Sequence, residues 1–368
     1  MNKYSIFFLI CVASIFAMGL LMVFDTTAAE VMNRSLDKST HHAVVKQIFY
    51  GIAGGLLAIF VWFVGYHSLL AFSRNILIVG TVLLIAVFVP HVGQQLNGAH
   101  RWVGMLGVSF QPSEFVKFLI PMTYIHFFLK REKPMQLLDF LKLVGMLCIP
   151  IGLILIEPDN GTAGIILVSL FVLFLMTRIR LVYWALPLAL IILCGGFVAS
   201  RMPHVQTRIS IYLHPELDLK GKGHQPYQAK IAAGSGKLFG KGVAESLQKL
   251  DYLPEARSDY IAAIFAEEYG FVGILGLILL YMALGFFGFS IAARASDIEG
   301  FYLVSILTFL ICFQAFLNLG VVSGLLPSKG TNLPFFSQGG SSLLANFMAV
   351  CIILNVAYTS EKYALKKN

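Results

Sequence analysis

The sequence predicts an all-α integral membrane protein: a polytopic bundle of about ten transmembrane helices with a large extracytoplasmic loop between helices 7 and 8. Two observations predict this fold. Of the 368 residues, 58% are hydrophobic and only 12% are charged, whereas a soluble domain carries about 25% charged residues. Several apolar runs also reach the ~20 residues that a helix needs to cross hydrocarbon. A soluble two-domain protein is therefore excluded.

Ten apolar runs define the predicted helices, and residues 1–368 form a single membrane domain. The first run, after Lys3, is longer than the 7–15 apolar residues of a cleaved signal peptide, so we expect it to be retained although Ala28-Ala29 resembles a cleavage site. The tight connection at 157–161 makes the fifth and sixth spans the hardest to separate. The predicted spans are 5–24, 45–66, 75–92, 113–129, 137–156, 161–177, 181–199, 270–293, 300–322 and 340–358.

Cations gather in the connections on one side of the predicted bundle. The positive-inside rule places that side, and with it both termini, in the cytoplasm. Because these cations orient the protein, the formal net charge of +8 does not indicate a nucleic-acid partner. The cations are Lys3, Arg74, Lys130, Arg131, Lys133, Arg178, Arg180, Arg294, Lys362, Lys366 and Lys367.

Four polar segments emerge on the opposite, outer side: 91–113, 157–162, 201–258 and 323–342. The third is rich in Gly, Lys and His, and a loop of this length is generally functional or disordered. Its composition favours a functional loop. No internal repeat is evident, which weakens a transporter interpretation, because many transporters are built from two related halves.

The five cysteines lie inside apolar runs, at spacings unlike those of metal ligands. We expect small buried side chains without disulfides. The sequence indicates no certain cofactor and leaves open a divalent cation, Mg²⁺ or Mn²⁺.

The start of the fourth span carries a charge pair. Ser113 can cap this helix, and Glu114 lies in the first turn, where the helix dipole favours a carboxylate. Glu114 and Lys117 share a helix face and can form an ordinary ion pair. Lys117, however, lies a turn inside the bilayer, where a charge is costly and usually functional.

Two short segments leave alternatives open. In 157–162 (EPDNGT), Asp159 or Asn160 can cap the sixth helix, or Glu157 and Asp159 can face a bound sugar or cation. The glycine-rich 234–242 (GSGKLFGKG) lacks a P-loop signature. Its amides and lysines can hold a diphosphate, or the segment is a flexible turn.

The stretch before the eighth span carries a dense group of charges. Pro254 suits the first turn of a helix. A continuous helix from Pro254 to Arg294 would be roughly 60 Å long, about twice the thickness of the hydrocarbon layer. We therefore expect a break at Gly270, with the part before it at the outer interface.

Glu255 and Asp259 would share a face of this predicted helix because they are four residues apart. A carboxylate at the interface is partly desolvated, which raises its pKa, whereas nearby Arg257 or Lys249 would lower it. That combination suits a general base.

The last outer segment, 323–342, combines two prolines, several glycines and small hydroxyl side chains. These residues predict an ordered, non-helical strip at membrane depth. Such backbone is tolerated only where it is buried in protein or lines a wet cavity. We interpret it as a cavity wall, with Lys329 as a candidate anion contact.

Taken in order, these segments resemble the SEDS proteins, the FtsW/RodA/SpoVE family, over nearly the whole chain, and 248–256 is closer to the division member. The resemblance implies a ten-helix fold and a peptidoglycan glycosyltransferase that polymerises lipid II, the substrate and source of the undecaprenyl-diphosphate-linked strand, at the outer face of the bacterial cytoplasmic membrane. It also implies a class B penicillin-binding protein partner and other division or elongation proteins. The motifs are GAHRW (98–102), QPSEFVKF (111–118), EPDNGT (157–162), GSGKLFGKG (234–242), LPEARSD (253–259), LLPSKG (325–330) and GGSS (339–342).

By this resemblance Asp259 matches the family's essential aspartate, the base that deprotonates the acceptor sugar. Arg101, Glu114 and Lys117 match positions that line the central cavity, and cations there would stabilise the diphosphate leaving group. Glu157 and Gln338 depart from the family's usual Gln and Tyr. The predicted substrate-binding residues are Arg101, Gln111, Glu114, Lys117, Asp159, Lys249, Glu255, Lys329 and Ser341.

Two other functions are compatible with the sequence. A lipid II flippase would need wet polar residues on both faces, yet the predicted cytoplasmic connections are short and chemically plain. The other is a scaffold that only binds and activates the transpeptidase, which strand synthesis by a purified complex would exclude.

Overall fold

The computed structural model describes residues 2–33, 40–96, 99–105, 108–189, 210, 212–219, 221, 223–250, 253–328 and 330–367. Residues 190–199 of the predicted seventh span, Cys194 among them, lie outside these ranges. So do 201–209 of the long loop, and Lys329.

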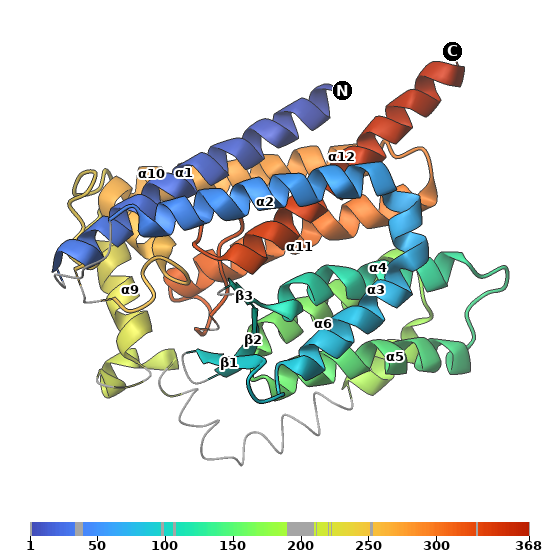
Figure 1. Cartoon of the computed structure of the whole chain (residues 1–368), viewed down its shortest axis with the longest axis horizontal. Coiled ribbons are helices and arrows are strands. Elements are labelled where there is room, and N and C mark those ends of the chain that lie inside the picture. The colour runs from blue at the N-terminus through green and yellow to red at the C-terminus, as the bar shows by residue number, and fades with distance from the viewer. Residues whose placement is uncertain are drawn as a thin grey trace.

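Long helices dominate the structure (Figure 1). Seven of those described are long and apolar enough to cross a membrane, in agreement with the predicted class. They are α1 (Lys3–Asn33), α2 (His42–Val64), α3 (Tyr66–Ala86), α5 (Leu137–Ile156), α10 (Ile261–Ala292), α11 (Ile298–Val322) and α12 (Gly340–Lys367). The apolar α6 (Asn160–Met176) is shorter, with 17 residues, and α4 (Pro112–Leu129) carries the Glu114–Lys117 pair. Residues 181–189 are also helical.

The helices form two groups that meet at α11 and α12. α1, α2 and α10 lie along one side, and α3, α4, α5 and α6 along the other (Figure 1). α11 packs against α10, α12, α4 and α6, whereas α12 packs against α2 and α4. Because helices of both groups surround them, α11 and α12 bury much of their surface. The outer helices instead expose apolar side chains, as expected for spans in contact with lipid.

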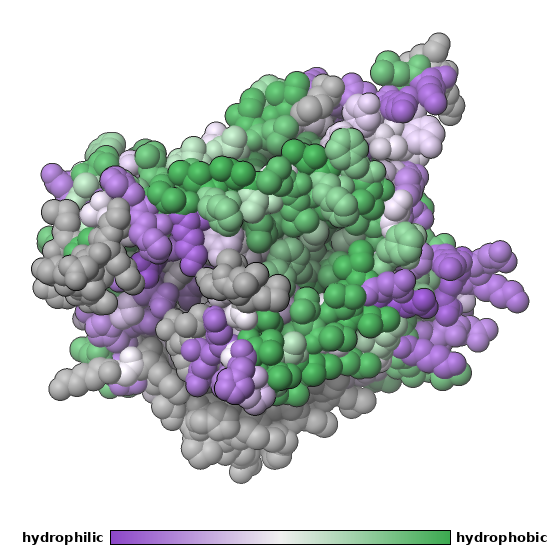
Figure 2. Space-filling model, viewed as in Figure 1, coloured by the Kyte–Doolittle hydropathy of each residue, from purple (hydrophilic) through white to green (hydrophobic). Residues whose placement is uncertain are grey.

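The surface reflects this arrangement (Figure 2). Hydrophobic side chains cover the middle of the molecule in this view, and hydrophilic ones gather towards its two ends. Cys148 is exposed on α5, contrary to the expected burial, whereas Cys11 and Cys351 are buried and Cys312 is partly so. Both termini lie at the end of the bundle that holds the α4–α5 and α10–α11 connections (Figure 1).

The third span begins earlier than predicted. Gly65, at φ 78°, ends α2, and α3 starts at once with Tyr66 rather than at residue 75. The backbone amide of Tyr66 donates to Asn355 Oδ1 at 3.1 Å, and its hydroxyl donates to Asp297. These distant partners anchor a helix start that local hydropathy misses. Arg74 consequently lies within α3 instead of in a connection.

A small sheet interrupts the helical pattern between α3 and α4. Strands β1 (Gly93–Leu96), β2 (Ala99–Met105) and β3 (Val108–Phe110) pair antiparallel in that order. In the register, Gln94 faces Trp102 and Val103 faces Phe110. The sequence predicts no strands, because its apolar periodicity reports only on the membrane spans. The sheet carries one wall of the cavity described below.

The long helix α10 breaks at Gly270, as its length predicts. Gly270 adopts φ 67° and ψ −165°, a conformation open to glycine. The glycine-rich segment 237–242 packs against this break: two of its amides donate to the carbonyls of Glu267 and Glu268, and two of its carbonyls accept from the two amides after Gly270, at 2.9–3.2 Å. These four bonds hold the segment as a fixed turn and leave the amides of Lys241 and Gly242 unable to bind a diphosphate.

Candidate active site

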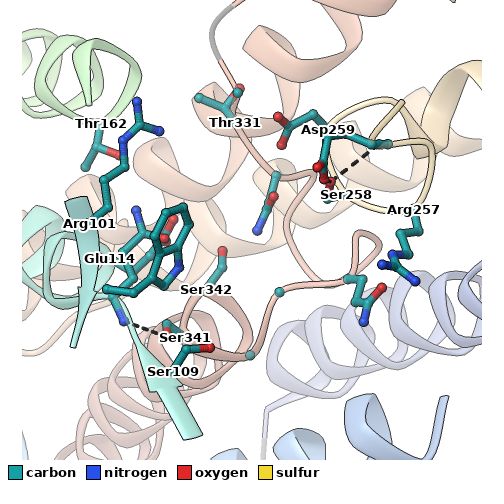
Figure 3. Close-up of a pocket in the computed structure, with 18 of the residues that line it drawn as sticks. Arg101, Ser109, Glu114, Thr162, Arg257, Ser258, Asp259, Thr331, Ser341 and Ser342 are labelled. Carbon is teal, nitrogen blue, oxygen red and sulfur yellow. Dashed lines mark hydrogen bonds between the residues drawn. The ribbon is translucent and has the colours of Figure 1, made fainter. Parts of the chain in front are cut away.

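A polar cavity of about 710 Å³ lies at the end of the bundle away from the termini (Figure 3). Its walls come from the starts of α2, α4 and α12, from β2, from α11, and from the segments 254–259 and 330–342. The cavity lining includes Lys46, Gln47, Tyr50, Arg101, Trp102, Gln111, Glu114, Lys117, Thr162, Glu255, Arg257, Asp259, Gln314, Thr331, Asn332, Gln338 and Ser341.

Asp259 lines this cavity from the turn just before α10. Its backbone carbonyl accepts from Asn318 Nδ2 at 2.8 Å, and the side-chain hydroxyl of the next residue, the buried Tyr260, contacts Ser328 Oγ at 2.7 Å, so the turn is tied to α11 and to the segment after α11. Desolvation, and secondarily the carboxylate of Glu255, raise the pKa of Asp259 to about 7, while Arg101 opposes the rise. A carboxyl with this pKa exchanges a proton near neutral pH.

The predicted helix through Glu255 and Asp259 is wrong. Residues 254–260 form consecutive turns, Glu255 has φ 56°, and helix α10 begins only at Ile261. The turn nevertheless keeps both carboxyls on the cavity wall. Ser258 Oγ donates to Glu255 Oε2 at 2.7 Å, which fixes the Glu255 side chain.

Glu114 and Lys117 form a buried pair in the wall of the cavity. Lys117 is 1% exposed, and its Nζ donates to Glu114 Oε2 at 2.5 Å and to Gln314 Oε1 at 2.7 Å. Gln314 in turn donates to the carbonyl of Asn332 at 2.9 Å. This network ties α4 to α11 and to the strip 330–342. The pair is thus far from an ordinary surface ion pair, which contributes little.

Asp159 lies just behind the wall and joins α6 to the start of α4. Its Oδ1 accepts from the Thr162 amide at 3.2 Å and so caps α6. Its Oδ2 accepts from Ser113 Oγ at 3.2 Å and from Gln111 Nε2 at 3.3 Å. The expected capping of α4 by Ser113 is wrong: Gln111 occupies the N-cap position, without a side-chain cap bond.

Gln111 also connects the wall to α12, because its backbone amide donates to Ser341 Oγ at 2.9 Å. Both side chains line the cavity. The strip that ends at Ser341 forms part of the wall, as its prolines, glycines and hydroxyl residues predict. Gln47 of α2 fastens this strip by donating to the carbonyl of Ser337 at 3.1 Å.

Arg101 reaches the cavity from β2. Its guanidinium donates to the carbonyls of Glu157 at 3.2 Å and Pro158 at 2.7 Å, which anchors the sheet on the α5–α6 hairpin. In Figure 3, Arg101 and Glu114 lie on one side of the cavity and Asp259 on the other. A cation and a proton acceptor therefore face the same space.

Glu157 is a carboxyl that the cavity does not reach. It is fully buried, and neither carboxyl oxygen has a hydrogen-bond partner among the described residues. Burial, together with Asp159, raises the pKa of Glu157 to about 8, against the opposing effect of Arg101. Glu157 is thus mostly protonated at neutral pH.

Lys249 does not line the cavity. Its Nζ lies 2.7 Å from both carboxylate oxygens of Asp25 and 2.6 Å from Glu268 Oε1, and the residue is buried. The structure therefore places this predicted substrate contact in an ion-pair cluster between α1, α10 and the long loop. Lys329, the other predicted anion contact, lies outside the described residues.

Several lining residues were not predicted. Gln314 has a usable signal, because it stands four residues before Asn318 within an apolar span, where polar side chains are costly. Lys46, Gln47 and Tyr50 have none, since polar residues at the end of a span are ordinary. In the ranges that the structure describes, no group of three or more His, Cys, Asp or Glu side chains could hold a metal ion.

The fold and the cavity define a class of protein: a polytopic helical membrane protein with a polar chamber at one end of its bundle, holding a proton acceptor and a cation. The family model described as cell cycle protein, which covers FtsW, RodA and SpoVE, matches residues 5–362. The chain belongs to this family.

Individual relatives are similar over almost their whole length. The probable peptidoglycan glycosyltransferase FtsW of Coxiella burnetii is 35% identical, with 98% of this chain and 97% of the relative covered. Stage V sporulation protein E of Bacillus subtilis is also 35% identical, with 93% of this chain and 94% of the relative covered.

Solved structures have the same architecture. A chain of a peptidoglycan synthase complex that coordinates polymerization and crosslinking superposes with a TM-score of 0.77 at 26% identity, covering 96% of this chain and 97% of the other. The rod shape determining protein RodA of Thermus thermophilus gives a TM-score of 0.67 at 25% identity, with 95% of each chain covered.

Proposed function

We propose that the protein is a peptidoglycan glycosyltransferase that polymerises lipid II into glycan strands at the outer face of the bacterial cytoplasmic membrane, for septal wall synthesis. The single observation that carries this proposal is the placement of Asp259, with a pKa of about 7, across one polar cavity from Arg101. The names of the FtsW relatives support the same reaction and the septal role.

The reaction follows from the positions of these groups. The Asp259 carboxylate takes the proton of an acceptor sugar hydroxyl, and the hydroxyl oxygen forms a bond to the anomeric carbon of the donor sugar. The bond from that carbon to the diphosphate oxygen breaks, and undecaprenyl diphosphate leaves with the electron pair. Arg101 stabilises the negative charge that develops on this leaving group.

Glu114 and Lys117 act mainly by holding the wall. Lys117 Nζ is shared between Glu114 and Gln314, so its charge is largely balanced before substrate binds. Gln111, Glu255 and Ser341 border the space where the sugars bind, and Asp159 supports Gln111 from behind. The apolar surface of the bundle accommodates the polyprenyl tails.

A class B penicillin-binding protein is the partner in this proposal, supported by the likeness to a chain of a peptidoglycan synthase complex. Such a partner crosslinks the strands that the cavity produces. In the same proposal both termini lie in the cytoplasm, which is supported by the end of the bundle that they share with the cation-rich α4–α5 connection.

The test is polymerisation of purified lipid II by the full chain in proteoliposomes, with and without the partner and with Mg²⁺, Mn²⁺ or a chelator. Asp259→Asn is expected to lower the rate by at least about 100-fold, the lower range for loss of a general base. Because the base must be ionised, the rate should rise with pH and level off above about 7.

Three outcomes would overturn the assignment. A rate unchanged by Asp259→Asn, with a normal unfolding temperature, would exclude Asp259 as the base. Absence of polymer in every complex tested would favour a scaffold, and movement of labelled lipid II across the bilayer without polymerisation would favour a flippase.

A further inference from the structure

The turn at 237–239 presents two large apolar side chains to the outside of the protein. Leu238 is 61% exposed and Phe239 is 80% exposed. The turn is nevertheless held firmly, because the carbonyls of Lys237 and Leu238 accept from the amides of Phe271 and Val272 at 2.9 and 3.1 Å. Two large apolar side chains that are exposed on a fixed backbone indicate a surface that contacts another molecule.

The turn lies at the end of a lipid-facing surface. After the break at Gly270, α10 exposes one stripe of apolar side chains along its length, and the turn bonds to Phe271, the first residue of that stripe, and to the exposed Val272 beside it. The exposed apolar surface of α10 therefore continues onto Leu238 and Phe239. The stripe consists of Phe271, Leu275, Leu279, Met282, Phe286 and Phe289.

The length of α10 sets the depth of the turn. From Phe271 to Ala292 the helix is about 33 Å long at 1.5 Å per residue, close to the ~30 Å of a hydrocarbon core. Arg294 follows the inner end of this part of the helix. The outer end, with Gly270 and the turn, therefore lies at the boundary between hydrocarbon and headgroups.

The charges beside the turn agree with this depth. Lys237 is exposed next to Leu238, as expected for a side chain that reaches headgroup phosphates while its neighbours contact acyl chains. Lys241, at the other end of the turn, instead donates to Glu267 Oε1 at 2.5 Å and fixes the turn to α10.

We propose that the turn 237–239 inserts into the outer leaflet of the membrane, with Leu238 and Phe239 at the acyl boundary and Lys237 at the phosphates. Bonded to α10 at its break, the turn holds the Gly270 end of the membrane-spanning part at a fixed depth, and with it the outer part of α10, which begins at Ile261, two residues after Asp259. The partner that fits this surface is an anionic phospholipid layer.

The experiment measures depth with a nitroxide spin label. The label is placed at Phe239→Cys, and separately at Leu238→Cys, in a full-length variant whose native cysteines are replaced and whose unfolding temperature is unchanged. The protein is reconstituted into vesicles of phosphatidylethanolamine and phosphatidylglycerol. Matched labels at Leu217, exposed in the outer loop, and at Leu275, on the stripe, mark water and hydrocarbon.

At both turn positions the ratio of collision rates with oxygen and with a water-soluble nickel chelate should lie between the two reference labels, several-fold above that at Leu217. Ratios equal to that at Leu217 would overturn the proposal. So would protection from the chelate that arises only after a class B penicillin-binding protein is added, because the surface would then belong to a protein interface.

Discussion

Glu157 and Asp259 are both carboxyl groups outside the helices whose pKa is raised by burial, yet only one of them reaches the cavity. Asp259 lines it, whereas Glu157 is 0% exposed behind Arg101. A raised pKa indicates a base only where the carboxyl can meet substrate. Glu157 instead acts as a neutral carboxylic acid behind the wall, close in shape to the Gln that the family resemblance leads us to expect there.

Replacing Glu157 by Gln should stabilise the protein, and more so as pH rises. The pKa of Glu157 is about 8 in the folded state and near its ordinary 4.5 when unfolded. Between these values the folded state holds a proton that the unfolded state has lost, so stability falls with increasing pH. Glu157→Gln removes this loss.

Thermal unfolding in detergent checks the prediction. The unfolding temperature of Glu157→Gln should exceed that of the parent by several degrees at pH 8, at roughly 2–4 °C per kcal/mol, and by little at pH 5. Glu132→Gln, on the exposed α4–α5 connection, is the control and should change neither value. Equal gains at both pH values would contradict the argument.

At the scale of elements, the Glu114–Lys117 pair decides how α4 is held against α11. Lys117→Met leaves the Glu114 carboxylate buried without its cation, and breaking a buried pair costs about 3–5 kcal/mol. The double variant Glu114→Gln/Lys117→Met removes both charges and should recover most of that loss in unfolding experiments. If the double variant were as unstable as Lys117→Met, the Lys117 ammonium would stabilise the fold mainly through contacts other than its pair with Glu114.

The break in α10 gives a second prediction at this scale. A Cβ at Gly270 would lie 2.3 Å from the amide nitrogen of Gly240, and its φ of 67° strains any other residue. Gly270→Ala should therefore cost about 1–3 kcal/mol or more. Gly276→Ala, in the same helix with no atom within 4 Å of the added Cβ, should be neutral or slightly stabilising.

Size-exclusion profiles and unfolding temperatures of these two variants provide the measurement. A Gly270→Ala protein as stable as the parent would contradict the strain expected from its φ and from the contact with Gly240. Gly270→Ala is also expected to polymerise lipid II more slowly. The break at Gly270 sets the direction of the outer part of α10, which begins two residues after Asp259.

Features with a local cause could be predicted from the sequence. That α10 must break follows from its length and the position of the break from the glycine at 270, and the limits of α5 follow from an apolar run bounded by polar residues. The start of α3 could not be predicted, because Tyr66 is held by Asn355 and Asp297, far along the chain. The small sheet was missed for a similar reason, since its pairing lies outside the spans.

The candidate site also combines residues that the sequence identifies with residues whose role depends on distant partners. Asp259, Arg101 and Lys117 stand out in the sequence as charges beside apolar runs, and the structure brings them to one cavity. Lys249 stands out equally, but its partners Asp25 and Glu268 come from other helices, so the sequence could not separate a substrate contact from an ion-pair cluster.

For the whole molecule, the ends of the bundle differ in chemistry. The starts of α2, α4 and α12 meet at the cavity end, whereas the termini lie at the other end (Figure 1). α1 reaches the cavity end as well: Glu30 pairs with Arg257, on the cavity wall, at 2.8 Å. Helix α1 therefore helps to hold the segment that carries Asp259.

This polarity predicts how the protein lies in the membrane. Leu217→Cys in the outer loop and Glu132→Cys in the α4–α5 connection are both exposed positions, each introduced into a variant without native cysteines. A membrane-impermeant maleimide should label position 217 in spheroplasts, where the outer face of the cytoplasmic membrane is accessible, and position 132 only after that membrane is permeabilised. The physical reason is the cation excess in the α4–α5 connection, which keeps that end in the cytoplasm. The reverse pattern would turn the cavity with Asp259 towards the cytoplasm, and polymerisation at the outer face would then be impossible.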